Sequence, residues 1–217
     1  GATDDDNSCE FPEQYLDCQG DCVNDCNENG ICDEIDNFTG ILITNENIQQ
    51  AVDAYFSETD YAIETYGNIS CWDVSNLTDM SYLFYDKYFL LISEYHISGG
   101  ISGWDVSNVT NMKSMFRDRR TFNQDIGNWD VSKVTDMAIM FSGATSFNQD
   151  INKWDVSKVT DMAYMFSGAT SFNGSTSGWS FAEGANLSYM FNGVTSFNQD
   201  ISDWNTSNVT NMSGLFN

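Results

Sequence analysis

Apolar side chains recur along most of the chain with a fixed period. Tryptophans mark this repeat at Trp72, Trp104, Trp129, Trp154, Trp179 and Trp204, and the last five stand 25 residues apart. Methionine or leucine recurs eight and eleven residues after each tryptophan, and phenylalanine recurs after twelve. A cofactor or substrate pocket is the weaker interpretation of so many methionines and aromatics. Residues that are apolar once per repeat predict a solenoid whose stacked repeats share one core.

Each repeat has two halves with different spacings. In residues 151–156 the apolar positions fit a short strand that directs alternate side chains inward. In residues 159–166 they recur at i, i+3, i+6 and i+7, which predicts one face of a short helix. Ser157 or Thr160 is the expected N-cap of this helix. Asp161 is expected in its first turn, where the helix dipole favours an anion.

The repeated words W-D-V-S-N-V-T-x-M-x-x-M-F and F-N-Q-D-I resemble the BspA-like leucine-rich repeats of bacterial and protist surface proteins. The resemblance covers residues 72–217, as six repeats of which the last is incomplete. The expected fold class is therefore an α/β repeat solenoid of leucine-rich-repeat type, with a short strand and a short helix in each repeat. The resemblance also implies a secreted or cell-surface protein that binds other macromolecules, and it does not imply a catalytic activity.

Residues 37–71 are expected to form a helical cap. One apolar face of a helix is predicted by Ile48, Ala51, Val52, Tyr55 and Phe56. Thr44 or Asn45 is the expected N-cap of this helix. A second short helix is expected from about Asp60 to Tyr66, ended by Gly67. Because a solenoid exposes apolar core at its ends, this helical pair is expected to close the N-terminal end.

The charge of the chain restricts its partners. The formal net charge is -24, from 32 acidic and 8 basic residues. This excess argues against nucleic acid or an anionic membrane surface as a partner, and it suits divalent cations, basic partners or a saline medium. No apolar stretch is long enough to insert into a membrane. The start at Gly1 resembles a mature or trimmed N-terminus, and more repeats or another subunit are expected beyond Asn217.

Cysteine usage predicts a disulfide-rich module at residues 1–36. The six cysteines are Cys9, Cys18, Cys22, Cys26, Cys32 and Cys71. An even number, with five in the first 32 residues, is typical of a disulfide framework in an oxidising compartment. Zinc is the competing interpretation, but the spacing lacks paired C-x-x-C knuckles and the only histidine is the distant His96.

The same module contains a candidate calcium loop at residues 25–36. Oxygen-bearing side chains fall at loop positions 1, 3, 5, 9 and 12, and Gly30 occupies position 6. A twelve-residue Ca²⁺ loop needs these oxygens, the backbone carbonyl at position 7 and a glycine for its sharp turn. The expected ligands are Asp25, Asn27, Asn29, the Ile31 carbonyl, Asp33 and Asp36. A solvated acidic turn with accidental spacing is the alternative.

With aspartate rather than glutamate at position 12, the loop resembles those of dockerins and thrombospondin type 3 modules. Related cysteine-bearing calcium modules generally carry cysteines at Cys9, Cys18, Cys22 and Cys32, which implies that these four pair among themselves. Cys26 and Cys71 then remain, and a disulfide bond between them is expected. The alternative is that Cys71 is a free buried thiol.

Polar columns are expected on the outside of the solenoid. An aspartate follows the tryptophan in each of the first four repeats, forming a possible binding surface of Asp73, Asp105, Asp130 and Asp155. A second column is more consistent with a structural ladder that bonds backbone groups, and it contains Asn123, Asn148, Asn173 and Asn198. The first repeat carries seven extra residues within 85–100, which are expected to form a loop at the solenoid edge. Such a loop either binds a partner or is neutral.

An enzyme is the poorest hypothesis, because His96 is the only histidine and lies in the irregular insertion. The expected function is a non-enzymatic binding or adhesion module that is extracellular or on the cell surface and carries structural Ca²⁺. Its expected partner is a protein or glycan at a cell or matrix surface, or copies of itself. The alternative is a structural subunit of an extracellular filament or surface layer.

Overall fold

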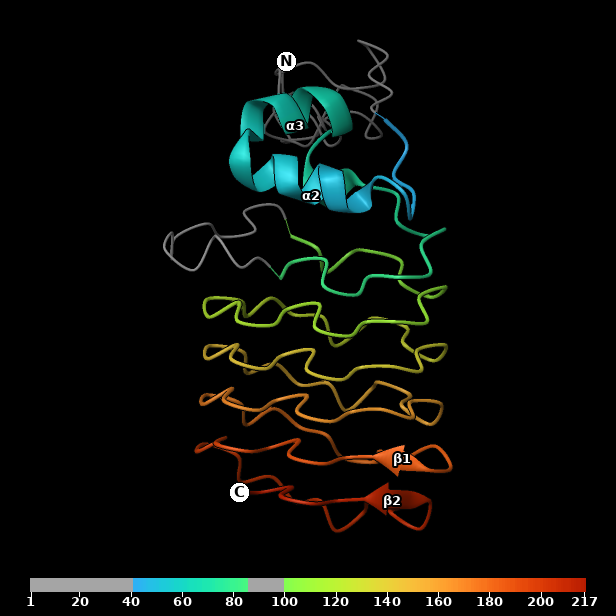
Figure 1. The fold of residues 1–217 in the computed structure, drawn as a ribbon, viewed down its shortest axis with the longest axis vertical. Helices are drawn as coiled ribbons and strands as arrows, with labels where there is room; N and C mark the ends of the chain where they lie inside the picture. The colour runs from blue at the N-terminus through green and yellow to red at the C-terminus, as the bar shows by residue number, and fades with distance from the viewer. Residues whose placement is uncertain (1–40, 86–99) are drawn as a thin grey trace, which may run out of the picture.

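The structure is a computed structural model, and it describes residues 41–85 and 100–217. These residues form an elongated stack of flat coils, with two helices lying across one end (Figure 1). One repeat makes one coil, so the chain moves down the stack by one coil for each tryptophan. No helix in these two ranges combines the length and the apolarity needed to cross a membrane.

Two helices cover the N-terminal end of the stack. Helix α2 (Ile48–Ser57) buries the apolar face that its sequence predicts. Helix α3 (Thr59–Tyr66) follows at once, as predicted, and ends at Gly67, which has a φ of 77°. A short 3-10 helix, η1 (Ile69–Cys71), then leads into the first coil. The two predicted helices are therefore present, within a few residues of their expected bounds.

The predicted N-cap of α2 is wrong by two residues. The cap is Asn47 rather than Thr44 or Asn45, and its side chain makes no capping hydrogen bond to the helix. The Asn47 Oδ1 atom instead accepts a hydrogen bond from the Thr44 N–H at 2.8 Å. Asn45 forms a hydrogen bond with the first coil, in which its Oδ1 accepts from the Thr78 N–H at 3.0 Å. A polar residue near a helix start therefore need not be its cap.

Helix α2 packs on the first coil through aromatic rings. The Tyr55 and Trp72 ring centroids are 6.2 Å apart, and those of Phe56 and Phe84 are 6.3 Å apart, both pairs nearly perpendicular. Arg119, from the second coil, lies with its guanidinium carbon 4.8 Å from the Phe56 ring centroid and donates through Nε to the Phe84 carbonyl. The cap is thus fixed to two coils.

Parallel backbone pairing joins each coil to the next. Isolated parallel bridges connect equivalent residues of successive coils, from Asp79 to Asn111, Asp136, Asp161 and Asn186. The pairing widens into two short strands, β1 (Ala185–Asn186) and β2 (Val209–Asn211), at the far end of the stack. Since β2 follows β1 by one coil, the repeat period of the sequence is also the register of the pairing.

The short helix predicted in each repeat is wrong for the coils that the structure describes, where this half of the repeat forms turns. Alternate N–H groups donate to the next coil, from Met137 to Asp161, from Ile139 to Ala163 and from Phe141 to Met165, at 2.8–2.9 Å. A helix would direct these groups to residues four positions earlier. Residue 139 also has a φ of 64°, which a right-handed helix does not contain.

The predicted roles of the residues around this helix change accordingly. Asp161 does not face a helix dipole: its Oδ1 accepts a hydrogen bond from the Ala163 N–H at 2.9 Å within a turn. Thr160 is not an N-cap, because its Oγ1 donates to the Thr135 carbonyl at 3.1 Å. The predicted strand at residues 151–156 is a turn with inward-facing apolar side chains. The leucine-rich-repeat assignment of these coils stays a prediction.

The predicted core columns are confirmed by their burial. Every methionine except Met212 is buried. The phenylalanines of successive coils form a stacked column, with centroids 5.5 Å apart from Phe116 to Phe141 and from Phe141 to Phe166. In the last coil the same columns are exposed, at 40 % for Met212 and 56 % for Phe216. The core is thus one continuous column of sulfur and ring contacts.

Candidate functional site

The four aspartates that follow a tryptophan form the acidic column, which consists of Asp73, Asp105, Asp130 and Asp155. All four are exposed. In each, Oδ1 accepts a hydrogen bond of 3.0 Å from the backbone N–H of the serine two residues later. One carboxylate oxygen therefore closes a local turn. The other remains available to solvent or to a partner.

Hydrogen bonding favours the charged form of Asp73, Asp105 and Asp130 in this column. The Ser75 hydroxyl and N–H lower the pKa of Asp73, the Ser107 N–H and hydroxyl lower the pKa of Asp105, and Ser132 does the same for Asp130. Burial and the neighbouring aspartates oppose the shift at Asp105. Because these pKa values are depressed, the turns keep their charged hydrogen bonds at neutral pH and lose them only as the pH falls through the lowered values.

The structure brings the acidic residues close enough to interact. The pKa of Asp105 responds to both Asp73 and Asp130, which places the three in one electrostatic group. Besides the hydrogen bonds from Ser132, Lys133 and Lys158 lower the pKa of Asp130, so they partly compensate the middle of the column. In the next two coils the position is occupied by Ser180 and Asn205. The acidic column therefore belongs to the coils nearest the cap.

The asparagine column is structural, as predicted. The Oδ1 atom of Asn123 accepts from the Asn148 N–H, that of Asn148 from the Asn173 N–H, and that of Asn173 from the Asn198 N–H, at 2.7–2.8 Å. Each side chain thus satisfies a backbone donor one coil below. These amides are committed to the stack and are not a ligand site.

A third polar column, distinct from the acidic and asparagine columns, was not predicted from the sequence. It consists of the residues seven after each tryptophan, Asp79, Asn111, Asp136, Asp161, Asn186 and Asn211. Each accepts through Oδ1 from the N–H two residues later, at 2.8–3.1 Å. The signal was available, because this position is always aspartate or asparagine. These carboxylates and carboxamides shape the turn at the parallel pairing, so they are weaker candidates for binding.

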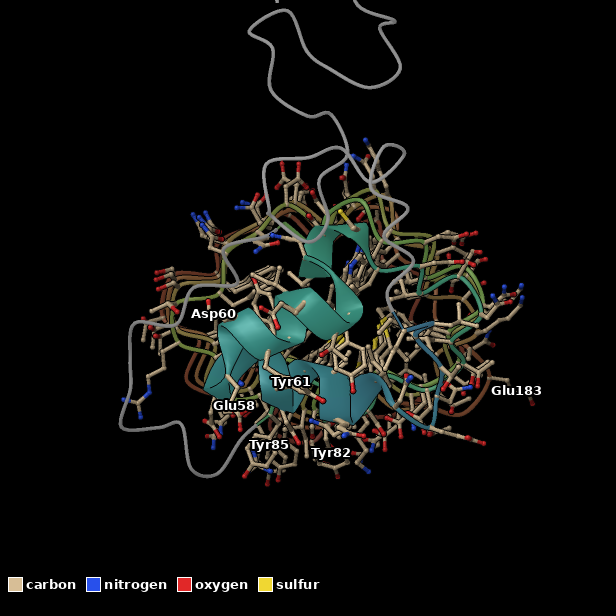
Figure 2. The ribbon with its side chains drawn as sticks, turned by 90° about the horizontal axis from the view of Figure 1, so that it is seen from above. Glu58, Asp60, Tyr61, Tyr82, Tyr85 and Glu183 are labelled. Atoms are coloured by element: carbon tan, nitrogen blue, oxygen red, sulfur yellow. The ribbon has the colours of Figure 1, made fainter. Side chains whose placement is uncertain are left out.

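The surface of the cap carries one open depression of about 440 Å³. It lies at the turn between α2 and α3 and is lined by Ser57, Glu58, Asp60 and Tyr61. Figure 2 shows the last three of these side chains on the helices at the end of the stack. The Ser57 hydroxyl is committed to the Asp53 carbonyl at 2.7 Å. The remaining polar groups face solvent without enclosing a ligand-sized space.

The predicted calcium ligands at 25–36 lie outside the described residues. Within 41–85 and 100–217, no group of three or more histidine, cysteine, aspartate or glutamate side chains is arranged to hold a metal ion. Cys71 takes part in a disulfide bond, which rules out a free thiol. The other five cysteines precede residue 40, so the pairing with Cys26 stays a prediction that non-reducing peptide mapping would decide.

A protein family matches the repeat region of the chain. Residues 89–187 and 156–217 match the family described as "Mycoplasma protein of unknown function, DUF285". The two matches overlap and together span residues 89–217, more than half of the 217 residues. No curated protein and no solved structure matches the chain significantly.

Proposed function

The chain belongs to the DUF285 family, and from that premise we propose that it is a non-enzymatic binding or adhesion protein, extracellular or at the cell surface. The observation that carries this proposal is the acidic column. Its carboxylates are exposed, recur once per coil and are fixed in orientation by a hydrogen bond to the turn below them. Such a row suits a partner that also presents charges along a line.

The electrostatics of the column favour binding over proton transfer. A general acid or base that works near neutral pH needs a pKa shifted towards 7. The shifts at Asp73, Asp105 and Asp130 go the other way, because each carboxylate accepts hydrogen bonds from serine. The column therefore stays negative, and it attracts cations over the whole physiological range.

The partner that this column fits best is a basic protein surface. The net charge of -24 disfavours nucleic acid. Exposed ion pairs contribute little singly, about 0.5 kcal/mol each, so several must act together. A rigid stack achieves this, since equivalent residues of paired coils lie roughly 5 Å apart.

Replacing Asp105, Asp130 and Asp155 together with asparagine tests the proposal. Asparagine can keep the turn, because Asn205 occupies the same position and its Oδ1 accepts from the Ser207 N–H at 3.2 Å. With the full chain in millimolar Ca²⁺ and at physiological salt, affinity for immobilised lysozyme, a basic protein, should fall roughly tenfold, as expected for three exposed pairs.

A triple change of Glu46, Glu58 and Glu64 to glutamine is the matched control. It removes the same charge from exposed residues of the cap region, and it should alter the affinity less than about twofold. Equal losses in the two triple variants would mean that only net charge matters. No loss in the column variant would place the binding surface elsewhere. Concentration-dependent assembly of the wild-type chain alone would favour the filament alternative.

We also propose that residues 25–36 bind structural Ca²⁺, on the ligand spacing of the sequence. Calorimetry on the chelated chain should show at least one Ca²⁺ site, because oxygen ligands at these positions match a twelve-residue loop. Asp25→Ala should weaken that site strongly. A wild-type chain that neither binds Ca²⁺ nor gains thermal stability from it would contradict the proposal.

A further inference from the structure

Two tyrosines and two basic residues meet on the first and second coils. We call Tyr82, Tyr85, Lys113 and Arg117 the basic aromatic patch. Figure 2 shows the two tyrosines next to each other on one flank of the stack. Their ring centroids are 6.1 Å apart with the rings tilted by 57°, and Tyr82 is 42 % exposed. The patch is therefore an accessible pair of rings rather than part of the core.

Backbone pairing brings residue 113 next to residue 82, and Arg117 lies beside the Tyr85 ring. The Tyr82 N–H donates to the Lys113 carbonyl at 2.8 Å. The guanidinium carbon of Arg117 lies 4.9 Å from the centroid of the Tyr85 ring, which is a cation–π distance. Because Tyr85 and Arg117 occupy equivalent positions in successive coils, the rigid register of the stack holds this arrangement.

The two cations keep unused binding capacity. Arg117 contacts Asp118 through Nε, at 3.4 Å, with 39 % of its side chain exposed. Among the described residues its terminal amino groups have no other ion pair, so they can bind an oxyanion. The Lys113 ammonium has no hydrogen bond or ion pair to any residue in the described ranges. By contrast, Lys133 and Lys153 donate to Asn108 and Asn128, at 2.6 and 2.8 Å.

The patch is also unusual in its charge. The whole chain has only 8 basic residues and a net charge of -24. Four of these basic residues, Lys113, Arg117, Arg119 and Arg120, fall within one stretch of the second coil. An island of positive charge on an acidic protein selects a small anionic group over a large anionic surface, because the surroundings repel the rest of such a surface.

We infer that the basic aromatic patch binds an acidic polysaccharide. A sugar ring would lie against Tyr82 and Tyr85, and its carboxylate or sulfate group would bind Arg117 and Lys113, since a guanidinium pairs with oxyanions through two parallel donors. Four side chains are far fewer than the 20–30 residues that each side of a stable protein interface needs. A polysaccharide is a thin chain with one charged group per sugar ring, so a patch of four side chains is large enough to bind it. The site is separate from the acidic column, which lies about half a coil away in sequence.

Binding of defined glycans to the full chain tests this inference. The probes are a heparin octasaccharide, which carries sulfate, tetragalacturonate, which carries carboxylate only, and neutral maltotetraose. At physiological salt the chain should bind one or both acidic probes saturably and should not bind maltotetraose. The double variant K113Q/R117Q should bind at least about tenfold more weakly. The matched double variant K153Q/K158Q, which removes two lysines from other columns, should change affinity less than about twofold.

Two further variants separate the ring contact from the charge. Tyr82 has a φ of 59°, which asparagine tolerates, so Tyr82→Asn should keep the backbone and weaken binding about fivefold. Lys113→Gln alone replaces an ammonium group that has no partner among the described residues, and it gives the charge test even if the double variant does not fold. The inference is overturned if wild type binds neither acidic probe, if the two double variants weaken binding equally, or if decaglutamate binds as tightly as the glycans.

Discussion

The indole N–H of each tryptophan from Trp104 onward ties one coil to the chain of the coil before it. Nε1 of Trp129 donates to the Ile101 carbonyl at 3.2 Å, that of Trp154 to Ile126 at 3.1 Å, and that of Trp179 to Ile151 at 3.2 Å. A buried indole without this acceptor would lose the free energy of an unsatisfied donor. The tryptophan is therefore both a core ring and the polar link that fixes the register.

One buried residue is polar in a column whose neighbouring members are apolar. Thr176 stands where the neighbouring coils have isoleucine, and its buried Oγ1 has no hydrogen-bond partner within residues 41–85 and 100–217. Thr176→Val removes an unsatisfied hydroxyl from the core, so the free energy of unfolding should rise by about 1 kcal/mol. Denaturant unfolding measures the change. Thr160→Val is the control, because that hydroxyl donates to Thr135 and its loss should not stabilise the protein. Equal effects of the two changes would contradict this explanation.

The turns of each coil show what the sequence could and could not predict. Periodicity identified the inward columns and the two cap helices, because burial repeats with the pattern of apolar residues. It could not identify the turns, since inward positions at i, i+3 and i+7 fit a helix equally well. The deciding hydrogen bonds go to residues about one coil away, such as Ile139 to Ala163. Local sequence does not report a partner at that distance.

Positive φ values complete this explanation. Residues 139 and 164 have φ values of 64° and 58°, although isoleucine and tyrosine rarely adopt this conformation. Neither position is a glycine, so nothing in the sequence indicated a positive φ, and a helix was expected. The inter-coil hydrogen bonds on both sides hold the strained residue in place.

Close approach of successive coils gives a test of the turn geometry. A Cβ atom on Gly174 would lie 2.0 Å from the Gln149 carbonyl oxygen, on the backbone of the preceding coil. Gly174→Ala should therefore force the two coils apart and cost about 1–3 kcal/mol of stability, seen as a lower thermal midpoint. Gly103→Ala is the matched control, because nothing lies within 4 Å of its added Cβ. If both variants melt at the wild-type temperature, the coils do not approach as closely as described.

The stack as a whole separates its structural polar groups from its free ones. In the columns that contain Asn148 and Asp136, the side-chain oxygens accept hydrogen bonds from backbone N–H groups. In the acidic column, one oxygen of each carboxylate accepts a hydrogen bond from a backbone N–H, and the other oxygen is exposed. The sequence predicted both the acidic column and the asparagine ladder, but it did not reveal the basic aromatic patch, because Tyr85 and Arg117 meet only across two coils.

The N-terminal module extends this arrangement as a prediction. If Cys26 pairs with Cys71, the bond would fasten the calcium loop to the capped end of the stack. In the chain-entropy model, closing so long a loop would contribute about 4 kcal/mol.

Carboxylate footprinting tests the central claim, that the acidic column is the surface that binds a basic partner. Carbodiimide labelling of the wild-type chain, read by mass spectrometry, reports each carboxylate with and without lysozyme. The account predicts that lysozyme protects Asp105, Asp130 and Asp155 and leaves Glu46 and Glu64 as reactive as before. Protection spread evenly over all exposed carboxylates, or confined to residues outside the column, would contradict it.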